Sequence, residues 1–114
     1  MGAIRNYRQI KDGNRETVAF STASGGWVDA RVLAANTAEV HTVPTGANYV
    51  LVTVTGNTWV NVGAAAAVAS ADVTNGAGSV LVVNTLPRMF ALNGAATVGI
   101  IAPAIQTACL EFYS

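Results

Sequence analysis

The segment 47–63 constrains the fold more than any other part of the chain. The valines of its first half stand at every second position: Val50, Val52 and Val54. A period of two is typical of a β-strand with one drier face, and the second half alternates in the same way. Gly56 and Asn57 separate the halves, and both residue types accept a positive φ at little cost. The segment therefore predicts two strands, which we expect to pair as a hairpin through a tight turn.

Further short strands separated by turn residues are predicted along the rest of the chain. Runs rich in apolar, β-branched or aromatic residues occupy 17–20, 27–33, 38–43, 89–92, 95–102 and 105–113. The continuous apolar run 79–85 predicts a strand buried on both faces, and Asn93 with Gly94 predicts a second hairpin. Segment 64–78 predicts a long connection with up to one helical turn. Seven or eight short strands without a long helix predict an all-β, antiparallel β-sandwich of jelly-roll-like form.

The chain divides into an arm and one domain. Its length of 114 residues fits a single globular core. Residues 1–24 mix charged, polar and small side chains with little periodicity, and we expect them to form an extended N-terminal arm. Residues 25–114 form the predicted sandwich domain.

Charge is scarce and unevenly distributed. Asp, Glu, Lys and Arg make up 11% of the residues, against about 25% in average globular domains. Six of the twelve charges lie in the first sixteen residues, four positive and two negative, so this segment carries +2 and the rest of the chain carries −2. A β-rich body with so few charges is poorly protected against association through its strand edges. We therefore expect an obligate homo-oligomer.

Composition argues against several classes of partner. The formal net charge is zero and the cations form no patch with interleaved aromatic residues, which argues against nucleic acid. Cys109 is the only cysteine, so the chain has no intrachain disulfide and no pair of thiolate ligands for a metal. No apolar run is long enough to cross a bilayer, and the N-terminus lacks the apolar core of a secretory signal. We expect a soluble protein that is made in a cytoplasm and has neither a cofactor nor a membrane partner.

Few residues suggest chemistry. Glu39 and His41 share one face of a predicted strand and could form an acid–base pair or half of a metal site. No third ligand or nucleophile lies near them in the sequence, so we expect a structural or interface pair. Asp29 and Arg31 also share a face, which indicates ion pairs at the surface or between subunits. We expect no enzyme activity; a small hydrolase that uses His41 is the weaker alternative.

The predicted interface combines aromatic and polar residues of the strands. We expect the oligomer interface to include Trp27, Arg31, His41 and Trp59. Aromatic residues on strands usually belong to the core or to subunit interfaces. A platform on which a sugar stacks is the alternative role for the tryptophans and for the tyrosines of the strands.

The N-terminal arm has two interpretations. One is a frayed terminus. The other is a segment that becomes ordered on a neighbouring subunit or a capsid, with one aromatic anchor and several cations as contacts. These contact residues would be Arg5, Tyr7, Arg8, Lys11 and Arg15.

Six short strings, taken in this order and spacing, resemble a group of small virion proteins of tailed bacteriophages. They are Val-Leu-Ala-Ala-Asn-Thr-Ala-Glu at 32–39, Val-Pro-Thr-Gly-Ala at 43–47, Trp-Val-Asn-Val-Gly at 59–63, Ala-Ser-Ala-Asp-Val-Thr-Asn-Gly at 69–76, Ile-Ala-Pro at 101–103 and Glu-Phe-Tyr at 111–113. The likeness covers roughly residues 17–114.

The resemblance implies a bacteriophage virion structural protein. In detail it implies a capsid decoration, or cement, protein that binds the head shell as a homotrimer, because small sandwich proteins that reinforce such shells commonly sit at local three-fold positions. Its partners would be the major capsid protein or another virion protein. Its location would be the virion, after synthesis in the host bacterial cytoplasm. The alternative is a head or tail fibre module that binds a host surface glycan.

Overall fold

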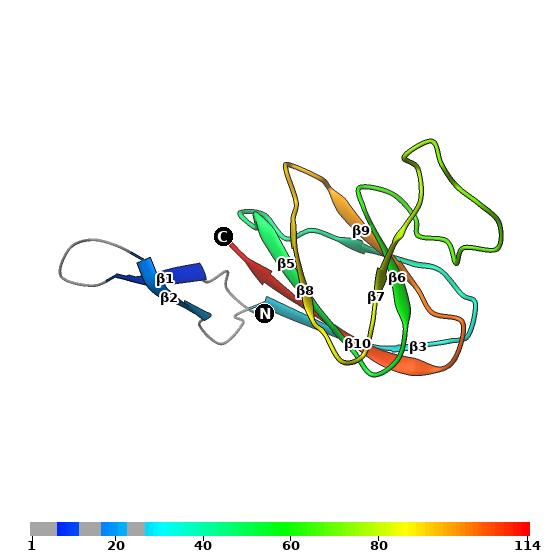
Figure 1. The fold of residues 1–114 in the computed structure, drawn as a ribbon, viewed down its shortest axis with the longest axis horizontal. Coiled ribbons are helices and arrows are strands. Elements are labelled where there is room, and N and C mark those ends of the chain that lie inside the picture. The colour runs from blue at the N-terminus through cyan, green and yellow to red at the C-terminus, as the bar shows by residue number, and fades with distance from the viewer. Residues whose placement is uncertain (1–6, 12–16, 23–26) are drawn as a thin grey trace.

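The computed structural model describes residues 7–11, 17–22 and 27–114. Within the last of these ranges, eight strands form two four-stranded antiparallel sheets that face each other (Figure 1). The first sheet has the order β3 (Trp27–Leu33), β10 (Gln106–Tyr113), β5 (Tyr49–Val54) and β8 (Arg88–Ala91). The second has the order β4 (Glu39–Thr42), β9 (Thr97–Ile101), β6 (Thr58–Val62) and β7 (Val80–Val82). The predicted antiparallel β-sandwich is confirmed.

The order of the strands is that of a jelly roll. Consecutive strands of the sandwich change sheet at every connection except the one between β6 and β7. Counted from β3 as strand 1, the first sheet reads 1-8-3-6 and the second reads 2-7-4-5. Each sheet is therefore built from strands far apart in the sequence, the nested arrangement of two Greek keys.

The core lies between the sheets and follows the alternation of the strands. β5 and β10 each turn every second residue inward, and these inward residues are buried except Gln106 at the start of β10. The core is aliphatic apart from one aromatic ring, and its buried members are Leu33, Val50, Val52, Val54, Val60, Val82, Leu92, Val98, Ile100, Ala102, Ala108, Leu110 and Phe112. The faces that the sequence predicts for β5, β6, β9 and β10 are confirmed by this burial.

The predicted hairpin at Gly56 and Asn57 is wrong. β5 pairs with β10 and β8, while β6 pairs with β9 and β7, so the two strands lie in different sheets. Neither residue has a positive φ. The connection is instead held by the side chain of Gln106, whose amide nitrogen donates to the carbonyl oxygens of Gly56 at 2.8 Å and Asn57 at 2.7 Å. Because both edges of β5 are occupied, no place beside it remains for β6.

The second predicted hairpin is wrong for the same reason. Asn93 and Gly94 do form a tight turn, with φ values of 51° and 80°, and the amide of Ala95 donates to the carbonyl of Leu92 at 2.9 Å. However, β8 before the turn belongs to the first sheet and β9 after it belongs to the second. The predicted turn at Asn93 and Gly94 is confirmed. It connects strands of different sheets, however, and not neighbouring strands of one sheet.

The predicted buried strand at 79–85 is also corrected. The strand is shorter, Val80–Val82, and it forms the edge of the second sheet. Val80 and Leu81 are exposed, and only Val82 is buried in the core. A continuous apolar run is compatible with an edge strand when one of its faces is left uncovered.

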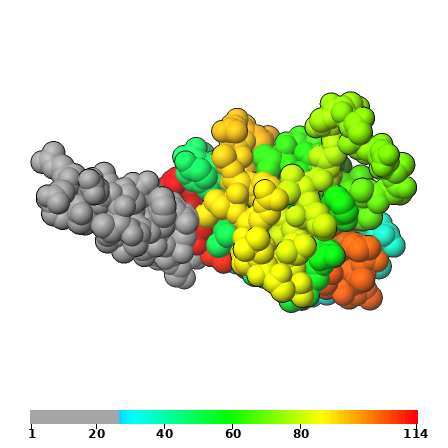
Figure 2. All heavy atoms as spheres, in the orientation of Figure 1, coloured from blue at the N-terminus to red at the C-terminus, as the bar shows by residue number. Residues whose placement is uncertain are grey.

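A long connection, 63–79, links β6 to β7; we call it the covering loop. It contains no helical turn, so the single turn that its alanines would allow is not formed. Its first residues cross the outer face of the second sheet at Gly99, where a Cβ atom would collide with the backbone of Ala64, Ala65 and Ala66. The loop then projects beyond the sandwich (Figures 1 and 2). The predicted long connection is thus confirmed.

The described part of the N-terminal arm is a two-stranded antiparallel ladder. β1 (Tyr7–Lys11) pairs with β2 (Thr17–Thr22), and neither strand joins a four-stranded sheet. β2 extends the strand predicted at 17–20 by two residues. Three of the predicted arm contacts, Tyr7, Arg8 and Lys11, belong to β1, whereas Arg5 and Arg15 lie outside the described residues.

Candidate functional site

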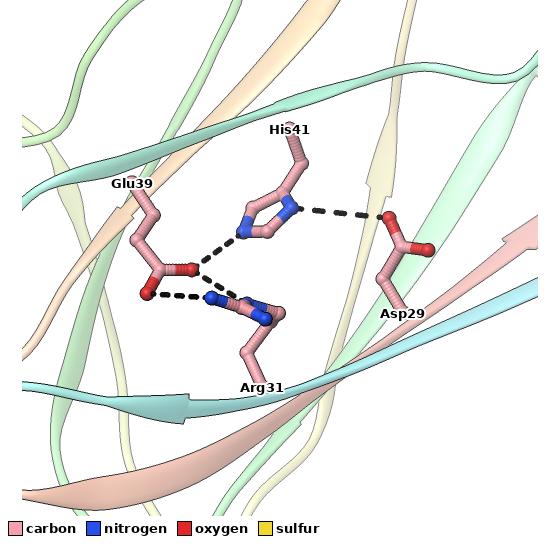
Figure 3. Close-up of polar contacts among 4 residues, drawn as sticks. All are labelled: Asp29, Arg31, Glu39 and His41. Carbon is pink, nitrogen blue, oxygen red and sulfur yellow. Dashed lines mark hydrogen bonds and ion pairs between the residues drawn. The ribbon is translucent and has the colours of Figure 1, made fainter.

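The main cluster of ionisable side chains lies at one open side of the sandwich. Asp29 and Arg31 come from β3 and Glu39 and His41 from β4; we call these four residues the edge cluster (Figure 3). β3 and β4 are edge strands of facing sheets. Alternation places both pairs on the inward faces, so the cluster closes the space between the sheets where the aliphatic core ends.

Glu39 is the centre of the edge cluster. Its Oε1 accepts hydrogen bonds from Arg31 Nε at 2.9 Å and from His41 Nε2 at 3.0 Å, and its Oε2 accepts from Arg31 Nη2 at 3.4 Å. Since a carboxylate is only an acceptor, Nε2 of His41 carries a proton. On the other side of the imidazole, Nδ1 lies 3.9 Å from Oδ2 of Asp29.

The ion pair between Arg31 and Glu39 shifts the pKa of both side chains. The hydrogen bond from Arg31 is the main reason that the pKa of Glu39 lies below its ordinary value, and the hydrogen bond from His41 adds to the effect against the opposing cost of burial. The same bond raises the pKa of Arg31. The side chain of Arg31 is 50% exposed, so solvent screens the pair and limits its contribution to stability.

Acid is expected to weaken the protein in part through Glu39. Because its pKa is lower in the folded state, the stabilisation is present above the ordinary glutamate pKa of about 4.3 and is lost as the pH falls through the folded-state pKa. Urea unfolding at pH 7 and pH 3 measures this. We expect the wild-type protein to be more stable than Glu39→Gln at pH 7 and the difference to shrink at pH 3. An equal difference at both values would contradict the assignment.

The edge cluster joins strands of the two facing sheets. Both oxygens of Glu39 accept hydrogen bonds from within the protein, from Arg31 of β3 and from His41 of β4. Across the part of the chain that the structure covers, no three His, Cys, Asp or Glu side chains are grouped so that they would hold a metal ion. The Arg31–Glu39 ion pair therefore links the two edge strands β3 and β4.

A second surface of interest is the outer face of the first sheet, which points away from the second sheet. Cross-strand pairing and alternation place these residues on it: Val28, Ala30, Val32, Tyr49, Leu51, Thr53, Met89, Ala91, Thr107, Cys109, Glu111 and Tyr113. Val32 is 68% exposed, and a shallow apolar depression of about 300 Å³ lies over β3, β10 and β5. Of the residues named, Glu111 alone is charged, and it accepts a hydrogen bond from Tyr113 at 2.8 Å.

Cys109 lies on this face without the features of a nucleophile. It is partly buried, and burial is the largest cause of the rise in the pKa of its thiol, followed by the charges of Glu111 and Asp29. A raised pKa keeps the thiol protonated at neutral pH, which lowers its reactivity.

The third feature is a hollow between the covering loop and the outer face of the second sheet. Its volume is about 390 Å³. Trp59 and Asn61 of β6 form its floor, and the loop contributes mainly alanines with Ser70 and Ser79. Trp59 is half-buried there.

The predicted interface residues do not form one surface. Arg31 and His41 meet around Glu39 between the two sheets, whereas Trp59 lies under the covering loop on the outer face of the second sheet. Trp27 packs against the core from the inward face of β3. Their role in an oligomer stays a prediction.

Sequence reasoning missed two parts of the arrangement. The apolar outer face of the first sheet was not identified, because both faces of β10 contain apolar residues and alternation alone does not say which face is covered. The bonds from Gln106 to the β5–β6 connection were also missed, since the residues are about fifty positions apart. No local signal in the sequence links them.

Within the described ranges, no helix combines the length and apolar character needed to cross a bilayer. Comparisons of the chain with protein-family models, with curated proteins and with solved structures find no match.

Proposed function

We propose that this protein is a structural component of a bacteriophage virion. In this proposal it is a capsid decoration protein that binds the head shell as a homotrimer, with the major capsid protein or another virion protein as its partner, and it is not an enzyme. The observation that carries the proposal is a jelly roll in which most of one apolar, nearly uncharged sheet face is uncovered, although Tyr113 at the end of β10 is buried. Jelly rolls occur in viral capsid proteins and in lectins, so the fold is compatible with the proposal without deciding it.

The area of the uncovered face indicates how much of a stable interface the first sheet could form. Four strands at their usual spacing, four to eight residues long, present about 400 Å². A stable interface usually buries about 800 Å² on each partner. The face therefore supplies a large part of one interface but falls short alone, and the N-terminal arm is the segment that would complete it.

Charge supports the division of roles between arm and body. The first sixteen residues carry +2 and the remainder carries −2. The proposed contacts of the arm with the shell are Arg5, Tyr7, Arg8, Lys11 and Arg15. Cations around an aromatic anchor suit an acidic surface with an apolar pocket.

The proposed mechanism is mass action. A protein that binds only the expanded shell lowers the free energy of that state by an amount set by its concentration and dissociation constant. Many copies bound over the head would add their contributions. The shell then resists the internal pressure of the packaged DNA without any chemical step.

The test of this proposal uses heads made without the protein. They are expected to release DNA at a lower temperature than complete heads, and addition of the purified full chain is expected to restore the higher temperature. Deletion of residues 1–16 should abolish restoration while leaving thermal unfolding of the body unchanged. Heads that bind none of the added protein would contradict the proposal.

A matched pair of threonine variants tests the uncovered face. Thr53 and Thr42 are both exposed on outer sheet faces, Thr53 on the first sheet and Thr42 on the second. Thr53→Asp places a charge on the proposed interface and is expected to reduce assembly, whereas Thr42→Asp is expected to assemble normally. Equal assembly of the two variants would exclude this face.

The hollow beneath the covering loop favours one alternative function. An indole floor flanked by Asn61 and two serines is a suitable surface for a sugar ring. A fibre module that recognises a host glycan would then lose binding on a glycan array in the Trp59→Ala variant. A silent array combined with tight binding to empty heads would reject this alternative. The other aromatic candidates fit it less well, because Trp27 packs against the core, Tyr113 is buried and Tyr49 lies on the first sheet, away from this hollow.

A further inference from the structure

Among the strands that the structure describes, β3 has the least protected outer edge. β3 has seven residues, whereas the other edge strands β4, β7 and β8 have four, three and four. It pairs with β10 from Trp27 to Leu33 without a register shift. Proteins usually blunt open edges with short strands, bulges, lysine or proline. None of these devices is found in β3.

The sequence of β3 is complementary to itself in the antiparallel direction. It reads Trp-Val-Asp-Ala-Arg-Val-Leu, with Ala30 at its centre. If two copies lie antiparallel with Ala30 opposite Ala30, then Val28 faces Val32 of the partner subunit. In the same register, Asp29 faces Arg31 of the partner subunit. Apolar residues thus meet apolar residues, and each charge meets its opposite.

Asp29 and Arg31 of the edge cluster can each form a further ion pair with a partner subunit. Among the described residues, Asp29 has its ion-pair contact with His41, whose Nδ1 lies 3.9 Å from Oδ2, beyond hydrogen-bond distance. Arg31 uses two of its nitrogens on Glu39, and its side chain is 50% exposed. A guanidinium has five N–H donors, so donors remain for a second carboxylate.

The direction in which Asp29 and Arg31 point decides whether the edge of β3 resists or favours pairing with another strand. An inward-pointing charge of one sign on an edge strand opposes association, because a docking strand would bury it unpaired. Asp29 and Arg31 have opposite signs and lie symmetrically about Ala30. In one register only, each charge therefore meets its opposite on the partner subunit, and association is favoured. Cross-strand pairs of opposite charge stabilise a sheet, and like pairs destabilise it.

We propose that a second copy of this chain pairs with the free edge of β3, joining two first sheets into a continuous eight-stranded sheet. The contact is two-fold symmetric, with the same patch on both copies. It goes beyond the proposed function and does not depend on it, since it forms in purified protein without a capsid. A trimer would use a different surface, and both contacts together would link trimers.

Cysteine cross-linking tests the register. Cys109 lies opposite Ala30 on β10, so the experiment uses a Cys109→Ser background. Opposed residues of antiparallel strands have Cα atoms about 4.5–5.5 Å apart, within the range of a disulfide. Ala30→Cys is therefore expected to form disulfide dimers on mild oxidation.

Val28→Cys and Val32→Cys are the matched controls in the same strand. Both positions are exposed on the outer face. In the proposed register, two copies of one variant place their cysteines about 14 Å apart, so neither variant is expected to cross-link alone. An equal mixture of the two is expected to give mixed dimers. The proposal is overturned if Ala30→Cys forms no dimer, or if Val28→Cys alone cross-links as readily.

The charge pairing has its own test. Asp29→Asn removes two ion pairs from the dimer, because symmetry repeats the change, and is expected to raise the dissociation constant about tenfold at low salt. Asp72→Asn, at an exposed position of the covering loop, is the control. Equal dissociation constants in sedimentation would overturn the register. A β3 dimer that does not bind heads would refute the proposed function alone, and a head-binding protein without β3 cross-links would refute this inference alone.

Discussion

Phe112→Ala is expected to lower the free energy of unfolding by about 3–5 kcal/mol, the usual cost of removing a buried phenylalanine ring. The side chain is 0% exposed and points into the core from β10. β10 is the only strand that pairs with both β3 and β5, and Phe112 is opposite Trp27 on one side and Val50 on the other. A cavity there would leave core residues of several strands without contacts. Because domains are stable by only about 5–15 kcal/mol, the loss is a large fraction of the total.

Urea unfolding at fixed protein concentration measures this effect, since association also stabilises the folded state. Ile105→Ala is the matched control: this residue directly precedes β10 but is 76% exposed. Its truncation is expected to change the stability by less than about 0.5 kcal/mol. Similar losses for the two variants would show that Phe112 does not lie in the core.

Gly99→Ala is expected to destabilise the protein by about 1–3 kcal/mol and to displace the covering loop. Gly99 is buried in β9, and its Cα faces the backbone of the loop. An added methyl group would meet the carbonyl oxygen of Ala64, the Cα of Ala65 and the amide nitrogen of Ala66. All three are backbone atoms, so no side chain can rotate away to make room.

Fluorescence of Trp59 reports on the loop because this residue forms the floor of the hollow beneath it. In a Trp27→Phe background, Gly99→Ala is expected to shift the emission of Trp59 to longer wavelength. Gly78→Ala, in the same loop, is the control, since its added methyl group would lie 3.7 Å from a side-chain atom of Val73, an ordinary contact. Unchanged emission and stability in Gly99→Ala would show that the loop does not cross the sheet at this point.

The positions of most strands and their inward faces could be predicted from the sequence. In β5 and β10 the alternation of side chains is a property of neighbouring residues, and the extended backbone turns that alternation into two faces. The inward set of β10, Ala108, Leu110 and Phe112, is buried as this rule requires. The turn at Asn93 and Gly94 could also be predicted from neighbouring residues, because it depends on which residues accept a positive φ.

Only the tertiary structure decided which strands pair and which charges meet. A tight turn such as Asn93–Gly94 is compatible with a hairpin or with a passage between layers, and the choice depends on whether the neighbouring edge is already occupied. β5 is enclosed by β10 and β8, so β6 lies in the other sheet. In the same way, two edge strands of facing sheets bring Arg31 to Glu39 and Asp29 to His41. Local chemistry determined the strands of this protein, and competition for sheet edges determined its topology and its edge cluster.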